Sequence, residues 1–217
     1  MDRNRLEKVQ WAGLTVLGLA AGLALALPAG IPIFAVLGAM AGTPIVLGIV
    51  GLSLGTAQWP IMRRHLSSAA WWVASSTLGM AIGLTLGVIV VEQIGRAFFG
   101  GPVNFRMLGV AARSASFGSI GLIGGAALGV AQWLVLRRQA AKCSRWIHVN
   151  ALSLGAGLAC GSLLADALML RTGSLGSTAV LLVIGSGAAG VCTARTLAGI
   201  FAPRVGQASA TRGTSAA

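Results

Sequence analysis

The sequence predicts an all-α fold, an integral membrane bundle of six transmembrane helices built from three tandem helical hairpins. The first observation is composition: 56% of the 217 residues are hydrophobic and only 9% are charged, whereas about a quarter are charged in soluble globular proteins. The second is an internal repeat, because two stretches of the chain align without gaps at a shift of 74 residues. Self-similarity of this kind indicates that one structural unit is used repeatedly.

Six uncharged segments are long enough to cross a hydrocarbon core of roughly 30 Å as helices. They are 10–28, 33–59, 72–91, 114–136, 146–165 and 175–194. Apolar and polar residues do not alternate within them, which excludes a membrane β-barrel. The first segment follows Arg3, Arg5 and Lys8 and so resembles a cleaved signal peptide. We retain it as a span because its tryptophan, leucine and glycine spacings recur in later segments.

The segments pair in chain order, within a transmembrane domain at 1–204, into hairpins at 9–62, 70–136 and 146–201. Each hairpin has a tryptophan near its start and a glycine near its end that recur in the repeat. These two residues are 44 residues apart in the first and third hairpins and 57 residues apart in the second. The 13 extra residues fall in the stretch 95–112, which we expect to be an outer loop. Residues 205–217 are rich in Ala, Ser, Thr and Gly and are expected to form a disordered cytoplasmic tail.

The repeated motif reads G-x-x-x-G-x-A-Q-W-x-x-x-R-R, with a further tryptophan after it. Its glycines, glutamine and first tryptophan share one helix face, and glycines four apart let a neighbouring helix approach closely. We interpret the motif as a packing surface, and alternatively as a contact with a partner, a lipid or a substrate. Its two copies comprise Gly51, Gly55, Gln58, Trp59, Arg63, Arg64 and Trp72, then Gly125, Gly129, Gln132, Trp133, Arg137, Arg138 and Trp146.

Charge orients the predicted bundle. Twelve of the 16 basic residues fall on one side of the six spans, so the positive-inside rule places both termini in the cytoplasm. This predicts a multi-pass protein of the bacterial inner (cell) membrane. We interpret the net charge of +12 as orientation and contact with anionic lipid headgroups, not as nucleic-acid binding, because no soluble domain gathers the basic residues.

All six tryptophans are expected at the same cytoplasmic interface. Interfacial tryptophans anchor a chain in the headgroup layer, but an aromatic belt is usually present at both faces. Stacking of the indole rings on a planar ligand or pigment therefore stays open as an alternative.

The sequence resembles uncharacterised bacterial multi-span membrane proteins in the segments Gly51–Arg64 and Gly125–Arg138 and in the tryptophans that follow them, Trp72 and Trp146. Those proteins carry repeated Gly-rich, Gln-Trp, Leu-Arg-Arg helical hairpins. The resemblance covers about two thirds of the chain. It implies the hairpin fold and no particular activity. The third hairpin departs from the pattern, because Thr193-Ala194 stands where the others have Gln-Trp.

Residues for catalysis are scarce, so we predict that the protein is not an enzyme and holds no metal or cofactor. Glu92 and Asp166 are related by the 74-residue shift and form a possible pair of outer-mouth carboxylates. An ion pair between Glu92 and Arg96, four residues apart, is the simpler interpretation. Ligation of a metal or pigment by His148 stays open.

Two functional classes remain. The first is a structural or accessory subunit of a larger membrane complex, whose partners are membrane lipids and other membrane subunits. It is favoured because no charged residue lies in the middle of any predicted span, where carriers and pumps usually keep one. The second is a small carrier or channel for a neutral or apolar solute, since repeated hairpins often build transporters. That alternative predicts a polar path lined by Gln58, Gln132, Thr43, Thr85 and Ser162.

Overall fold

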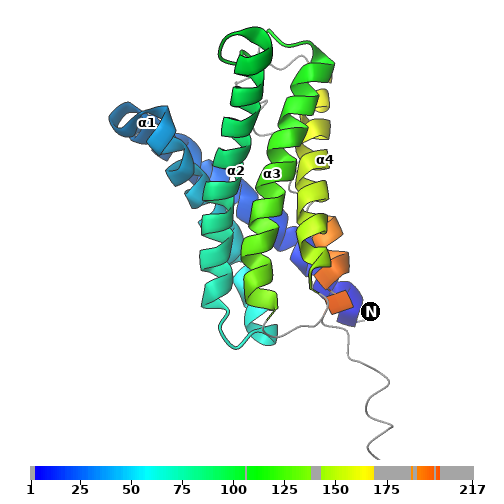
Figure 1. Ribbon diagram of the computed structural model, residues 1–217. Helices are drawn as coiled ribbons and strands as arrows, with labels where there is room; N and C mark the ends of the chain where they lie inside the picture. Colours follow the sequence, from blue (N-terminus) through cyan, green and yellow to red (C-terminus); the bar gives the residue numbers. More distant parts are fainter. Residues whose placement is uncertain are drawn as a thin grey trace, which may run out of the picture.

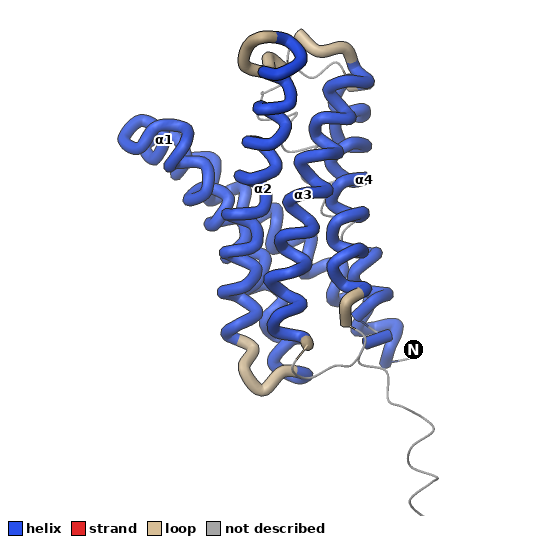
Figure 2. The backbone as a smooth tube through the Cα atoms, in the orientation of Figure 1, coloured by secondary structure: helices blue, strands red, loops and turns tan. Residues whose placement is uncertain are grey.

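The computed structural model describes residues 3–105, 107–137, 143–168, 187, 190–197 and 199–200. Its long helices are α1 (Arg3–His65), α2 (Ala70–Phe99), α3 (Val110–Leu136) and α4 (Arg145–Ala167). Residues 190–197 are also helical. The described chain is therefore all-α, as the sequence predicts (Figures 1 and 2).

Helix α1 is folded back on itself. It bends at Gly38, whose φ of 70° and ψ of 173° belong to a region that is essentially restricted to glycine. The two arms then pack together: a Cβ atom added at Gly18 would lie 2.8 Å from Ala57 Cβ, and one at Gly22 would lie 2.8 Å from Val50 Cα. The bend projects away from α2, α3 and α4 (Figure 1). Proline residues on both sides of the bend, at positions 28, 32 and 44, remove backbone donors there.

The expected number of six separate spans is wrong for the described residues. Four helices, α1 to α4, are long and apolar enough to cross a membrane. The segments 10–28 and 33–59 are the two arms of α1, which the non-helical Gly38 separates and which together form one of these four elements. In addition, most of 175–194 lies outside the described residues, as do the tail 205–217 and much of the third hairpin, 146–201.

Consecutive helices approach at motif glycines. A Cβ at Gly55 in α1 would lie 2.8 Å from Val73 Cα in α2, and a Cβ at Gly129 in α3 would lie 2.8 Å from Ile147 Cα in α4. Real Cβ atoms essentially never come within 3.0 Å of another atom, so a larger residue would push the helices apart. Such small residues let helix backbones make close van der Waals contact without a hydrophobic driving force in lipid.

The last described helix lies against the first arm of α1. A Cβ at Gly190 would lie 3.2 Å from Thr15 Cβ and 3.3 Å from Ala12 Cα. Gly190 stands 44 residues after Trp146, as Gly55 stands 44 after Trp11. The helix at 190–197 thus contacts the first arm of α1 and shares a core cluster with Trp146 of α4, so the described helices form a closed ring.

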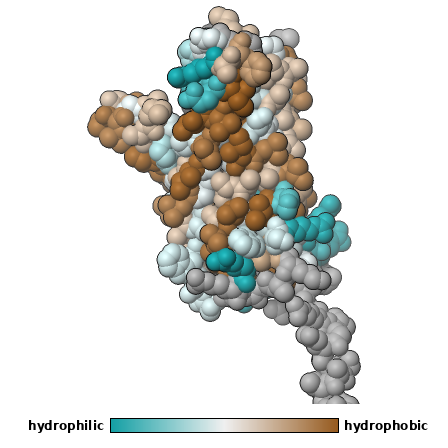
Figure 3. Space-filling model, in the orientation of Figure 1, coloured by the Kyte–Doolittle hydropathy of each residue, from teal (hydrophilic) through white to brown (hydrophobic). Residues whose placement is uncertain are grey.

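The outside of this ring is apolar. Large hydrophobic residues are exposed along every long helix, for example Leu17, Leu52, Ile82, Val130 and Leu152. Figure 3 shows apolar side chains along the flank of the bundle and hydrophilic ones toward its ends. A hydrocarbon environment suits such a surface, since a soluble monomer rarely exposes so large an apolar area.

Candidate functional site

Three tryptophans meet in the centre of the bundle, at the end where the chain begins. Trp11 of α1, Trp72 of α2 and Trp146 of α4 are each no more than 1% exposed. Their ring centroids lie 5.8 to 6.2 Å apart with interplanar angles of 64° to 71°, so every pair is edge-to-face. Edge-to-face pairs contribute about 0.5–1.5 kcal/mol beyond the area that they bury.

This burial corrects one expectation. Anchoring in the headgroup layer is wrong for these three tryptophans, because their rings contact one another inside the protein. The centroid separations also leave no room for a planar ligand between the rings. By contrast, Trp59 and Trp71 are exposed on the surface of the bundle, where an interfacial role stays a prediction.

The glutamine of the first motif copy connects α1 to α2. Its Nε2 donates to Thr15 Oγ1 at 2.9 Å, and its Oε1 accepts from Trp72 Nε1 at 3.0 Å, so Gln58 joins both arms of α1 to α2. Thr15 lies one helical turn beyond Trp11 and therefore on the same face. The close approach at Gly55 brings α2 within reach of this short amide.

The second motif copy makes the same connection one hairpin later. Gln132 Nε2 donates to Ser76 Oγ at 3.0 Å, and Trp146 Nε1 donates to Gln132 Oε1 at 2.9 Å. The amide thus links α2, α3 and α4. The two glutamines are 74 residues apart and both are buried.

A third connection returns to the start of the chain. Trp11 Nε1 donates to Thr193 Oγ1 at 2.9 Å, and Thr193 stands three residues after Gly190, as the glutamines stand three after their glycines. The indole N–H of each central tryptophan is therefore bonded to a side chain of the preceding helix in the ring. We use the name tryptophan ring for the three tryptophans, their hydrogen-bonded side chains, and Asn150, which stands four residues after Trp146 as Thr15 and Ser76 stand after their tryptophans. The tryptophan ring consists of Trp11, Thr15, Gln58, Trp72, Ser76, Gln132, Trp146, Asn150 and Thr193.

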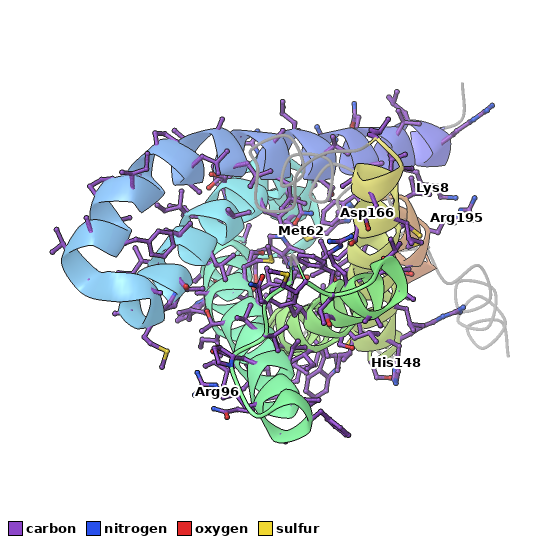
Figure 4. The ribbon with its side chains drawn as sticks, turned by 90° about the horizontal axis from the view of Figure 1, so that it is seen from above. Lys8, Met62, Arg96, His148, Asp166 and Arg195 are labelled. Carbon is purple, nitrogen blue, oxygen red and sulfur yellow. The ribbon has the colours of Figure 1, made fainter. Side chains whose placement is uncertain are left out.

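The ring is bounded by apolar layers. On one side lie Met62, Leu136 and Leu197, each four residues beyond a ring member and in one core cluster with the tryptophans. Met62 lies near the centre of the bundle when it is seen from above (Figure 4). On the other side, Leu19 and Leu154 begin a second core cluster. These layers separate the ring from both ends of the bundle.

A small cavity lies between the ring and the second layer. Its volume is about 30 Å³, far below the several hundred Å³ of ordinary ligand pockets. Gln58 and Gln132 line it, whereas Thr43, Thr85 and Ser162 do not. Its lining comprises Trp11, Thr15, Leu19, Leu54, Gln58, Met80, Leu128, Gln132, Trp146, Asn150, Leu154 and Thr193.

The two candidate carboxylates at the opposite end do not come together. Glu92 forms an exposed ion pair with Arg96 at 2.7 Å. Asp166 binds Arg113 through two bonds, 2.7 Å to Nη2 and 3.3 Å to Nε, with side chains only 14% and 12% exposed. Asp166 and Arg96 lie on different sides of the bundle (Figure 4). Each carboxylate is thus neutralised by its own arginine.

The remaining described motif residues lie nearer the surface of the bundle, with Trp133 half-buried. The Arg63 guanidinium stacks over the Trp59 ring at 5.1 Å from its centroid, and Arg137 stacks over Trp133 at 5.2 Å. Arg63 and Arg137 are exposed, as are Arg64 and His148; Arg138 lies outside the described residues. Within the described part of the chain, no three His, Cys, Asp or Glu side chains could together hold a metal ion.

Sequence reasoning missed Thr15 and Ser76, the hydroxyl partners of the glutamines, and the buried amide of Asn150. Thr15, Ser76 and Asn150 each stand four residues after a central tryptophan, a regularity that the sequence contains. The residue type differs at the three positions, so no identity marked them. The Asp166–Arg113 ion pair was missed because it joins α4 to the start of α3, a contact that no local spacing predicts.

No protein-family model, no curated protein and no solved structure matches this chain.

Proposed function

We propose that the chain is a non-enzymatic integral membrane protein that serves as a structural or accessory subunit of a larger membrane complex. The observation that carries the proposal is the tryptophan ring, which closes the axis of the bundle with buried aromatic rings and direct hydrogen bonds. A bundle closed in this way keeps its shape and offers its outer surface for contact. A channel along the axis of the bundle would require the side chains of the tryptophan ring to separate.

In the bacterial cell membrane, the proposed topology has α2, α3, α4 and the two arms of α1 crossing the bilayer. We infer from the positive-inside rule that the end of the bundle with the tryptophan ring faces the cytoplasm, together with both termini. A fluorescent protein fused to the C-terminus should fold and fluoresce, and alkaline phosphatase inserted in the 95–112 loop should be active. The reverse pattern would overturn the orientation.

Co-purification tests the subunit role. Gentle detergent extraction from native membranes should release the protein together with fixed membrane partners at constant stoichiometry. Recovery as a free monomer at native abundance would contradict the proposal. An absorption spectrum of the purified complex tests pigment binding at the same time.

Anionic lipid is the second proposed partner. The Trp59–Arg63 and Trp133–Arg137 stacks hold an aromatic ring and a cation together at the outer surface, a pairing suited to the headgroup layer. Native mass spectrometry should show retained phosphatidylglycerol in preference to phosphatidylcholine. Replacing Arg63 and Arg137 with glutamine should remove the preference, whereas the same change at Arg96, at the other end of the bundle, should leave it intact.

A small carrier for a neutral solute is the alternative. The central cavity supports it, because two polar amides line that space. The cavity is too small for any metabolite in this conformation. Swelling of proteoliposomes in glycerol or urea at the rate of protein-free vesicles would reject the carrier.

A further inference from the structure

The apolar stripe on the flank of α2 ends before the helix does. The large apolar residues exposed along this flank are Leu78, Ile82, Leu86 and Ile89. Gln93 and Arg96 stand four and seven residues after Ile89, so they continue the same face, and both are exposed. The flank of α2 therefore changes from apolar to polar at Gln93.

The position of Gln93 matches the far edge of a membrane. Trp71, exposed at the other end of α2, stands 22 residues before it, and 22 residues of α-helix rise by about 33 Å. The hydrocarbon core of a bilayer is about 30 Å thick. The last turns of α2, from Ile94 to Phe99, and the loop that joins them to α3 therefore extend beyond the hydrocarbon.

This outer end carries apolar residues that water would surround. We call them the outer patch; they are Ile94, Phe98, Met107 and Val110, which are 53%, 80%, 83% and 48% exposed. Phe98 stands seven residues after Val91 and so lies two turns above it on the same face of α2. Val110 stands in the same way above Phe117 on α3. Val91 and Phe117 pack in the second core cluster, so the outer patch continues the core-facing side of both helices past the end of the core. Figure 3 shows apolar and hydrophilic side chains next to each other at this end of the bundle.

Contacts beneath the outer patch hold the loop in place. The ring of Phe105 stacks on Phe117 with centroids 5.3 Å apart. The Arg113 guanidinium donates to the Phe105 carbonyl oxygen at 3.4 Å and also binds Asp166 of α4. A surface that is ordered in this way loses little conformational freedom when a partner binds, which lowers the cost of binding.

We propose that the outer patch is the docking surface for a partner subunit, which covers it from outside the membrane with an apolar surface rimmed by acidic residues. An apolar patch exposed to water marks a protein interaction site. A helix of a neighbouring protein within the membrane would instead contact the flank of α2. The stretch 92–113 contains three arginines and one glutamate, so acidic residues at the rim of the partner complement its charge. The inference rests on the subunit role proposed above and specifies the face through which that role is exercised.

Thiol labelling measures whether a partner covers the outer patch. Met107→Cys is treated with a membrane-impermeant maleimide in open fragments of native membrane. The same treatment follows after the chain has been purified free of partners and reconstituted into vesicles of native lipid. Labelling of the parent chain, which has three cysteines, is subtracted. Met107→Cys should react several-fold more slowly in the native membranes than in the vesicles. Ser68→Cys, at an exposed position in the loop at the other end of the bundle, should react equally in both.

Each of the other results would overturn the docking surface. Equal and fast labelling of Met107→Cys in both preparations would mean that nothing covers the patch. Slow labelling in both would mean that lipid covers it, and protection in vesicles that disappears when the chain is diluted with lipid would indicate a second copy of this chain. Recovery of a free monomer on gentle extraction rejects the subunit role itself, whereas fixed partners together with an unprotected thiol reject only this surface.

A pair of methionine variants provides a second measurement. Met107 and Met40 are 83% and 81% exposed, so serine at either position should leave the fold intact. Burial of such a side chain at an interface raises affinity by about tenfold or more. Met107→Ser should therefore lower the amount of partner recovered per chain by about tenfold, whereas Met40→Ser, at the bend of α1, should retain the wild-type amount. Equal recovery with the two variants would contradict the proposal.

Discussion

Replacing Gln132 with leucine removes the amide that links three helices at the tryptophan ring. The variant loses the bond to Ser76 and leaves the indole N–H of Trp146, a residue that is only 1% exposed, without its acceptor. An unpaired buried donor costs about 1–3 kcal/mol. A side-chain bond between membrane helices contributes about 0.6 kcal/mol on average. We therefore expect the free energy of unfolding to fall by roughly 2 kcal/mol.

A double-mutant cycle separates this hydrogen bond from general damage to packing. Trp146→Phe removes the indole donor, so in that background Gln132→Leu should cost less than about 1 kcal/mol, because only the Ser76 bond remains to be lost. Leu134→Ala, a change at an exposed position of the same helix, serves as the control and should alter stability by less than about 0.5 kcal/mol.

Equilibrium unfolding in mixed micelles, followed by far-ultraviolet circular dichroism, measures these changes without relying on tryptophan fluorescence. The reasoning fails if Gln132→Leu unfolds with the wild-type free energy. It also fails if the loss is equally large with and without the Trp146 indole, since the amide would then stabilise the bundle by some route other than this bond.

Three further outcomes follow from the same geometry. Three contacting indoles produce an exciton couplet near 220 nm in the circular dichroism spectrum, and Trp72→Phe should remove most of it. Trp71→Phe, which changes a residue that is 66% exposed, should leave the couplet intact. Equal spectra of the two variants would contradict the contacts between the indole rings. Arg113→Met leaves the Asp166 carboxylate, which is 14% exposed, without its partner, so the free energy of unfolding should fall by about 3 kcal/mol. Arg96→Met should change the free energy of unfolding by less than about 1 kcal/mol. Similar losses in the two variants would refute the difference in burial between the two ion pairs. Gly129→Ala places a Cβ 2.8 Å from backbone of α4 and should cost about 1–3 kcal/mol in the same assay; unchanged stability would mean that the helices do not approach closely there.

The helical segments were predictable because the signal for them is local. An uncharged apolar stretch of adequate length must satisfy its backbone internally in a membrane, and a helix does this within one segment. The stretches 72–91, 114–136 and 146–165 lie within α2, α3 and α4. The break that the sequence predicts between 28 and 33 lies five to ten residues before the bend at Gly38, because prolines mark where donors are missing and not where the chain turns.

The roles of particular residues were harder to predict. Hydropathy and spacing place Trp59 and Trp72 alike at one end of the bundle, yet one ring is exposed and the other is fully buried. The difference is rotational. It depends on which face of each helix points toward the axis, and a one-sided set of tryptophans carries no information on that choice.

The sequence by itself determined that the chain is helical, apolar on its outside and repetitive, and that its glutamines share a face with the motif glycines. Each of these properties is a matter of composition or of spacing along one helix. Only the tertiary structure decided that Trp11, Trp72 and Trp146 meet on a common axis, that Gln58 and Gln132 bond to them, and that a small cavity lies beside the two glutamines. Those features require segments far apart in sequence to lie within hydrogen-bond distance, and the packing of all the helices together sets that distance.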